Sequence, residues 1–297
     1  MRAPIKVFSM ILLGWILSTP ALAFDYQIQI SEQNAVLPSP AVVNDPAYLA
    51  DSVVAKGQGD IQRAWLSDAT TRYQHGVFGI AVEAASITAQ LRNGQRVKFT
   101  LPENSVFEDR RLRLVDMDGD GKQEIISMRT YLDKGAALVV LGLNNNLLEI
   151  VAEAPAIGLP MRWLNPVGVA DFDGDGALEI AVVNTPHIGG TLKLYQLSGD
   201  QLAEKYALYG FSNHANKSLP QQLSAIMDLD GDDQPEILLP NAGRSSLEIV
   251  TVKKGALKTV ASIPVENEIT GPFRVNGKTL SMPLVNGQLL AITFNSH

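Results

Sequence analysis

The chain has 297 residues, of which 46% are hydrophobic and 19% are charged, so it can bury a sizeable core and is not globally disordered. Its net charge of -7 at pH 7 argues against a nucleic-acid-binding protein, because such proteins usually carry a basic patch. Cysteine is absent, which excludes a disulfide framework, a thiolate nucleophile and a cysteine-ligated zinc site.

Residues 1–23 have the pattern of a secretory signal peptide. Two basic residues precede an apolar run over residues 7–17, which is too short for a comfortable membrane span, and Ala21-Leu22-Ala23 resembles a cleavage site. We expect a single mature domain at residues 24–297, located in the periplasm or secreted, with no membrane span. An N-terminal anchor that is not cleaved is the alternative.

One acidic pattern then occurs three times, and its spacing indicates a repeat architecture. The copies are separated by 55 and 57 residues, and they read DMDGDGKQEII at 116–126, DFDGDGALEIA at 171–181 and DLDGDDQPEIL at 228–238.

Each copy places carboxylates at positions 1, 3, 5 and 9 and leaves a backbone carbonyl free to bind at position 7. The predicted ligands of the three loops are Asp116, Asp118, Asp120, Lys122 and Glu124; Asp171, Asp173, Asp175, Ala177 and Glu179; Asp228, Asp230, Asp232, Gln234 and Glu236. Such closely spaced carboxylates repel one another unless a cation neutralises them, and an oxygen-only ligand set suits Ca²⁺. We therefore expect about three structural calcium sites, with solvated turns that bind no metal as the alternative.

The loops differ from an EF-hand, which needs a glutamate at position 12 and flanking helices. Position 12 is Ser127, Val182 or Leu239, and the residues after each loop are apolar and typical of strands. Glycines at positions 4 and 6 permit a tight curl with positive φ, and Asp233, which replaces the second glycine in the third copy, tolerates the same conformation.

The D-x-D-G-D-G-x-x-E-[IL] pattern and its spacing resemble the FG-GAP/VCBS repeats of integrin α-chain propellers and of many bacterial secreted proteins. The resemblance covers residues 105–262, although the flanking Phe-Gly and Gly-Ala-Pro elements of that family are poorly matched. It implies an all-β fold, a β-propeller whose blades are stiffened by calcium, and it does not imply one function.

Strand patterns predict four strands in each repeat and three strands at the C-terminus. They also predict a further blade upstream that lacks calcium, because Gly57-Gln58-Gly59-Asp60 replaces the acidic loop there. The alternating residues 24–30 can supply the missing strand of this last blade. We therefore expect five four-stranded blades closed by the N-terminal strand. An open array, or a six-bladed ring that uses residues 31–50, is the alternative.

In such a fold the calcium loops occupy one face, and the strand 2–3 loops and the connections between blades occupy the other. The candidate partner-binding residues on this calcium-free face are Arg72, Tyr73, His75, Glu108, Asp109, Asp133, Arg162, Trp163, Asn165, His187, Asn213 and His214. Loops on a rigid scaffold commonly carry binding groups, and aromatic and arginine side chains are typical interface anchors.

Each of these residues also has a structural interpretation, as a side chain that fills a gap between blades, caps a turn or pairs with an arginine. A zinc site would need His75, His187 and His214 to converge. A glycosidase would need a carboxylate pair from Glu108, Asp109 and Asp133. No common nucleophile, phosphate-binding or dinucleotide-binding motif occurs. We expect a monomeric binding or scaffold module for a protein or glycan, with a carbohydrate-active enzyme as the alternative.

Overall fold

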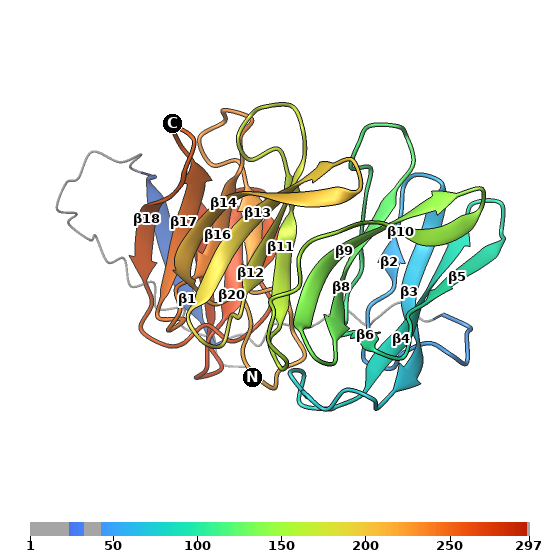
Figure 1. The fold of residues 1–297 in the computed structure, drawn as a ribbon. Coiled ribbons are helices and arrows are strands. Elements are labelled where there is room, and N and C mark those ends of the chain that lie inside the picture. Colours follow the sequence, from blue (N-terminus) through green and yellow to red (C-terminus); the bar gives the residue numbers. More distant parts are fainter. Residues whose placement is uncertain (1–23, 33–42, 296–297) are drawn as a thin grey trace, which may run out of the picture.

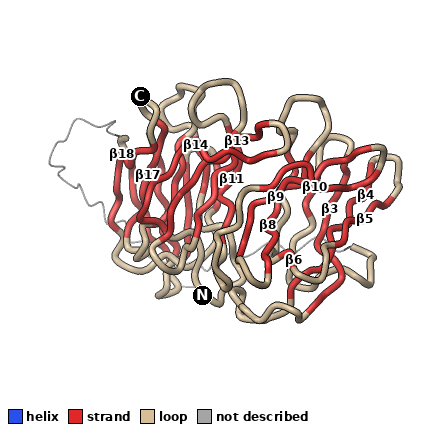
Figure 2. Tube along the Cα trace, in the orientation of Figure 1, coloured by secondary structure: helices blue, strands red, loops and turns tan. Residues whose placement is uncertain are grey.

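The computed structural model describes residues 24–32 and 43–295, which form β-strands joined by loops (Figure 1). The predicted signal peptide and residues 33–42, half of the 31–50 segment, lie outside these residues. The described part of the chain holds no helix of a length and hydropathy suited to crossing a membrane. Figure 2 shows the strands running side by side, with the loops gathered at their two ends.

The strand pairing divides the chain into four-stranded antiparallel units, numbered here in chain order. Unit one contains β2 (Ala55–Lys56), β3 (Ile61–Thr70), β4 (Glu83–Leu91) and β5 (Arg96–Thr100). Unit two contains β7 (Arg113–Val115), β8 (Glu124–Tyr131), β9 (Gly135–Asn144) and β10 (Leu147–Glu153). Unit three contains β11 (Leu164–Ala170), β12 (Glu179–Asn184), β13 (Gly190–Ser198) and β14 (Gln201–Phe211).

The last two units complete the series. Unit four contains β15 (Ala225–Met227), β16 (Glu236–Pro240), β17 (Ser246–Val252) and β18 (Leu257–Pro264). Unit five contains β19 (Arg274–Asn276), β20 (Thr279–Pro283), β21 (Leu289–Phe294) and β1 (Tyr26–Ser31). The N-terminal strand therefore pairs with the C-terminal strand, in a register that runs from Tyr26↔Phe294 to Ser31↔Leu289, and the predicted role of this strand is confirmed.

The short strand β6 (Ser105–Phe107) was not predicted. It pairs with β4 of unit one and with β8 of unit two, so it bridges the two units at the end opposite the acidic loops. Together with one parallel pair between β10 and β14, it joins the first three units into one continuous sheet.

Alternating apolar residues on each strand form cores between consecutive units. Four hydrophobic clusters lie between units one and two, two and three, three and four, and four and five. The first strands of neighbouring units also lie close together, because Val53 bridges to Arg111 and the Phe273 amide donates to the Gln222 carbonyl at 2.6 Å. Four-stranded meanders stacked face to face around their first strands are the arrangement of a β-propeller, as the resemblance implied.

The segment 43–54 covers the face of unit one that points away from unit two. Trp65 lies on this face, packs against Val43, Val54 and Tyr48, and donates its indole N–H to Asp45 at 2.9 Å. Among the described residues, no hydrophobic cluster joins unit five to unit one. The segment 43–54 thus performs, for unit one, the covering role that a neighbouring unit performs elsewhere.

Candidate functional site: an acidic edge and an aromatic edge

The three acidic loops share one set of internal hydrogen bonds, which the side chains of their own motif provide. In the first loop Asp116 accepts the amides of Gly119 and Gly121 at 2.8 and 3.0 Å. Asp118 accepts the amide of Asp120 at 3.1 Å, and Asp120 accepts that of Lys122 at 2.7 Å. The position-1 and position-5 bonds recur in the other loops, so the motif sets the shape of its own loop.

The tight curl also has the predicted backbone conformation. The glycines at positions 4 and 6 have φ between 73° and 89°, and Asp233 has φ of 65°. The third loop therefore keeps its shape with an aspartate in the left-handed region.

The glutamate at position 9 lies under each loop and is held by the amide of position 2. The Met117, Phe172 and Leu229 amides donate to Glu124, Glu179 and Glu236, each at 2.9 Å. Burial, together with the neighbouring aspartates, raises the pKa of Glu124 and of Glu236 to about 7, against the effect of that amide bond. These buried carboxyl groups lack compensating positive charge, and a bound cation would supply it.

In every loop, oxygens from positions 1, 3 and 9 come together. The three groups are Asp116, Asp118 and Glu124; Asp171, Asp173 and Glu179; Asp228, Asp230 and Glu236, with the ligand atoms of each within 4.8 Å of one another. This geometry and the oxygen-only donor set fit a hard divalent cation. The position-5 carboxylates are not part of these groups.

The second loop differs from the others because a lysine of β14 reaches into it. Lys205 Nζ lies 2.7 Å from Asp173, 2.7 Å from Asp175 and 3.4 Å from Glu179. Burial opposes the charge of Lys205, but its hydrogen bonds to the two aspartates raise its pKa overall, and they lower the pKa of Asp175 to about 2. The carboxylates of this loop are thus neutralised in part from within the chain, which no local sequence signal indicates.

In unit one the turn at Gly57–Asp60 also holds a cationic side chain. The guanidinium of Arg92 donates to the backbone carbonyls of Gly57, Gln58 and Gly59. Asp60 accepts the amide of Gln123 at 2.9 Å, which ties this turn to the first acidic loop. A side-chain cation therefore occupies the loop that the sequence predicts to lack calcium.

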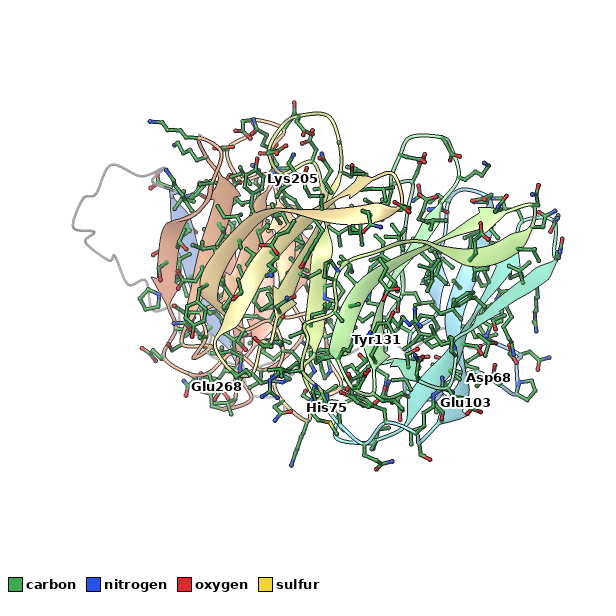
Figure 3. All side chains as sticks on the ribbon, viewed as in Figure 1. Asp68, His75, Glu103, Tyr131, Lys205 and Glu268 are labelled. Carbon is green, nitrogen blue, oxygen red and sulfur yellow. The ribbon has the colours of Figure 1, made fainter. Side chains whose placement is uncertain are left out.

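The opposite edge of the sheets is closed by a loop that crosses between units. Residues 71–82 leave unit one, and the Val77 carbonyl accepts the Lys217 amide at 2.9 Å. Phe78 packs edge-on against Trp163 and His214, with ring centroids 5.4 and 5.6 Å apart. The two edges lie at opposite ends of the strands, as the positions of Lys205 and His75 in Figure 3 show. An apolar run over residues 77–82, VFGIAV, inside a long loop was the available sequence signal for this crossing.

Around Phe78 the predicted aromatic and histidine residues form one packed cluster. Trp163 stacks on His187 with an interplanar angle of 11°, and its indole N–H donates to the Glu108 carbonyl at 2.9 Å. His187 Nε2 and His214 Nδ1 are 2.8 Å apart, and His214 Nε2 lies 2.8 Å from the Ser218 carbonyl. Because a carbonyl only accepts, neutral His214 carries its proton on Nε2 and accepts the His187 Nε2–H.

Burial keeps this histidine pair neutral. It lowers the pKa of His187 to about 4 and that of His214 to about 3, and the nearby charge of Arg244 acts in the same direction on both. His75 bonds instead to Glu108, with Nδ1 2.8 Å from the carboxylate. The three histidines do not form a metal-ligand group, since the groups found in the described chain are the three acidic loops.

Seven of the twelve candidate partner-binding residues are buried, which corrects their expected role as surface contacts. They are Tyr73, Glu108, Asp109, Trp163, Asn165, Asn213 and His214. Asn165 and Asn213 exchange amide-to-carbonyl hydrogen bonds of 3.0 and 3.1 Å across units, and Tyr73 accepts the Met161 amide at 3.0 Å. Sequence position placed these residues at the expected edge, but contacts with other segments of the chain bury them.

The remaining five candidates keep some exposure: Arg72, His75, Asp133, Arg162 and His187. The acids from which a glycosidase would need a carboxylate pair lie in different environments: Glu108 and Asp109 are fully buried, and Asp133 is exposed on the turn between β8 and β9. Asp109 accepts bonds from the Arg110 and Arg111 amides, Ser127 and Arg113.

The comparison with protein families supports the repeated acidic pattern found in the sequence. Residues 116–182 match the FG-GAP-like repeat family, a span that contains the first two acidic loops. No curated protein matches the chain. One similar solved structure is the WD40 domain of Toxoplasma gondii coronin, with 13% identity and a TM-score of 0.41 over 77% of this chain. The match spans 56% of that chain's length. Residues 116–182 of this all-β chain are thus similar to FG-GAP-like repeats.

Proposed function

We propose that this protein is an exported binding module, stabilised by calcium at its acidic edge, that contacts a protein partner through its aromatic edge. The surface observation that carries the proposal is a set of large apolar side chains on the loops of that edge. Ile80, Leu159, Met161, Ile188 and Leu219 are between 42% and 62% exposed. Apolar side chains exposed together on one edge are typical of an interaction surface.

Charged and polar groups accompany these residues. Arg162 follows Met161 directly, and the half-buried His187 precedes Ile188. An apolar centre with an arginine and aromatic neighbours resembles protein interfaces more than a sugar-binding cleft. The packed cluster of Phe78, Trp163 and His214 holds the loops in place beneath this surface, which reduces the entropy lost on binding.

Calcium in this proposal is structural. When bound, it would supply the positive charge that the loop carboxylates lack and would tie the first strand of a unit to the second. The residues that would hold it are the aspartates at positions 1 and 3 and the glutamate at position 9 of each loop.

No observation favours the enzymatic alternative, so we propose a binding role for the chain. Glu108 and Asp109, the acids that such an enzyme would use, are fully buried and bonded to neighbouring groups.

The test is capture of periplasmic or extracellular partners by the purified protein in calcium, followed by affinity measurement with each captured protein. Leu159→Glu/Ile188→Glu should weaken binding at least tenfold. The matched control is Leu147→Glu, which is 68% exposed but lies on the β9–β10 turn at the acidic edge, and it should leave the affinity unchanged. Equal losses in both variants, or no loss in either, would contradict the proposed surface.

A further inference from the structure

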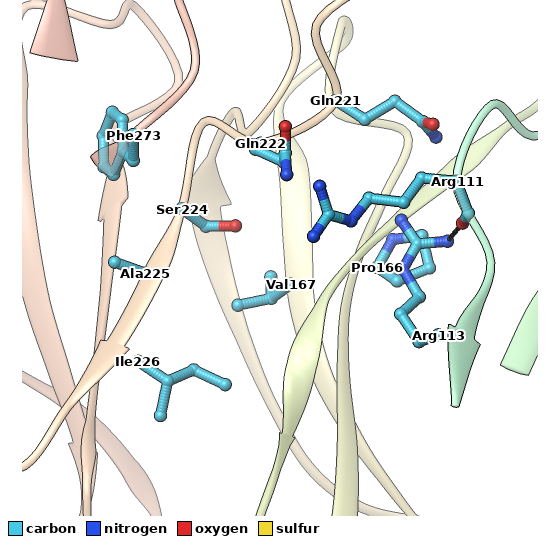
Figure 4. A pocket seen from close by; sticks show the side chains of 10 residues that line it. All are labelled: Arg111, Arg113, Pro166, Val167, Gln221, Gln222, Ser224, Ala225, Ile226 and Phe273. Atoms are coloured by element: carbon cyan, nitrogen blue, oxygen red, sulfur yellow. Dashed lines mark hydrogen bonds between the residues drawn. The ribbon is translucent and has the colours of Figure 1, made fainter. Parts of the chain in front are cut away.

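A cavity of about 270 Å³, partly open to solvent, lies among residues on and next to the first strands of units two to five. Arg111 and Arg113 line it from unit two, Pro166 and Val167 from unit three, and Phe273 from unit five. Figure 4 shows these residues converging from separate strands. The cavity therefore exists only when consecutive units are assembled.

The guanidinium of Arg111 points into this cavity, toward Gln222 and Ser224 (Figure 4). It has no hydrogen-bond or ion-pair partner within the described residues. The neighbouring Arg113 differs, because it pairs with Asp109 at 2.8 Å. The lining thus carries one guanidinium that has no ion-pair partner among the described residues.

No carboxylate of the described residues lines the cavity. The carboxylate of Asp109 accepts four hydrogen bonds, including one from the Arg111 amide, but none from the Arg111 guanidinium. The cavity walls and repulsion from Arg113 lower the pKa of Arg111, and the charge of Asp109 acts in the opposite direction. The Arg111 side chain stays exposed to solvent, so a bound anion can reach it.

Two further polar side chains of β15 and the segment before it are available to a ligand. The Gln222 amide and the Ser224 hydroxyl have no hydrogen-bond partner in the described part of the chain. Gln221, by contrast, already accepts from the Arg110 amide at 2.9 Å. The remaining walls are apolar and include Val167, Ile226 and Phe273.

We propose that this cavity binds a small monocarboxylate with a short apolar body. The planar guanidinium of Arg111 matches a carboxylate in a two-bond geometry, and Gln222 and Ser224 donate to its free lone pairs. One guanidinium without an ion-pair partner in the described chain suits a monoanion, and Val167, Ile226 and Phe273 contact the apolar body.

The experiment titrates the purified, calcium-loaded full chain with isovalerate and, separately, with isovaleramide, its neutral analogue. Binding is followed by calorimetry and by NMR shifts of the Arg111 and Gln222 signals. Isovalerate should bind at least tenfold more tightly than isovaleramide, and Arg111→Gln should reduce isovalerate affinity at least tenfold. Lys258→Gln, which removes an exposed charge from β18, should change neither value.

Three results would overturn the proposal: equal binding of isovalerate and isovaleramide, unchanged affinity in Arg111→Gln, or tighter binding of inorganic phosphate than of isovalerate. If Arg111→Gln fails to fold, the comparison of isovalerate with isovaleramide on the unmodified protein still decides the question. Tripeptides with free and amidated C-termini distinguish a free small carboxylate from a peptide C-terminus as the ligand. No partner protein is needed, so the outcome is independent of the binding role proposed above.

Discussion

The acidic edge and the aromatic edge of the sheets differ in how their charged and polar side chains are compensated. At the acidic edge, three loops gather carboxylates. Lys205 contacts Asp173, Asp175 and Glu179 in the loop of unit three, whereas Lys122 pairs with Asp120 in the first loop and Lys278 donates to backbone carbonyls of the third. At the aromatic edge, polar side chains are buried with partners from other units, as in the His187–His214 pair and the Asn165–Asn213 exchange. We propose that a dissolved cation completes the first edge, whereas packing within the chain holds the second.

The largest expected effect concerns packing at the aromatic edge. Trp163→Ala removes a side chain that is 2% exposed, stacks on His187 and packs against Phe78. We expect a loss of about 3–5 kcal/mol in the free energy of unfolding, because a cavity remains in a rigid core. Urea denaturation measures it. Tyr209→Ala, at a residue 71% exposed, is the control and should cost much less. Similar losses in the two variants would contradict the idea that this edge is held by packing.

Removal of calcium tests the acidic edge. At 1 mM calcium and a dissociation constant of about 10⁻⁴–10⁻³ M, each site contributes about 0.4–1.4 kcal/mol to stability. We expect EDTA to lower the melting temperature and excess calcium to restore it. Asp230→Asn, in the loop of unit four, should reduce the calcium response but leave the aromatic edge intact. A melting temperature that is the same in EDTA and in calcium would rule out structural calcium.

The pH dependence of stability tests the aromatic edge. The folded-state pKa values of His187 and His214, about 4 and 3, lie below the ordinary value of 6.5. The unfolded chain therefore binds protons first, so their contribution to stability is present above pH 6.5 and declines as the pH falls from there. Each histidine contributes a slope of up to about 1.4 kcal/mol per pH unit.

The measurement compares the wild type with His187→Gln by denaturation between pH 7 and pH 5, both in EDTA. Glutamine can still donate to His214 Nδ1 but does not titrate, so the slope should be smaller in the variant. The difference between the two chains isolates the histidine effect from the acidic loops, whose glutamates titrate in both. Identical slopes would show that His187 is not held neutral by burial.

The smallest expected effect is a change in calcium affinity at one of the acidic loops. Lys205→Met removes the ammonium that contacts Asp173 and Asp175, so calcium should bind the loop of unit three more tightly, by roughly two- to fivefold, as expected for a partly exposed ion pair. Calorimetric titration with calcium measures the change. Lys193→Met removes a lysine that pairs with Glu204 in the same sheet, and it should have no effect. Unchanged affinity in Lys205→Met would mean that Lys205 does not compete with the metal.

Several features could be predicted from the sequence because neighbouring residues produce them. The acidic loops form their own hydrogen bonds, as between Asp116 and Gly119, and their glycines have the required positive φ. The alternation in residues 24–30 predicted the strand that pairs with β21. The four strands predicted in each repeat are present, as β12, β16 and β17 illustrate, since apolar alternation and turn residues limit them on both sides.

The contacts that decide function depend instead on residues far apart in the chain. Lys205 reaches the loop of Asp173 because β14 folds back beside it, and Phe78 reaches Trp163 because residues 71–82 cross from another unit. Glu108 is buried against His75 of that crossing segment, and Asn165 is buried against Asn213 and Gln221.

The sequence by itself determined the repeat, the shape of the acidic loops, the all-β class and the pairing of the two ends of the chain, because short-range hydrogen bonding and alternating hydrophobicity specify them. Only the tertiary structure decided that Lys205 contacts the carboxylates in the loop of unit three, which predicted surface residues are buried, and that Arg111 lines a cavity without an ion-pair partner in the described chain. The physical reason is that charge compensation and burial depend on every group nearby in space, and most of those groups come from other units.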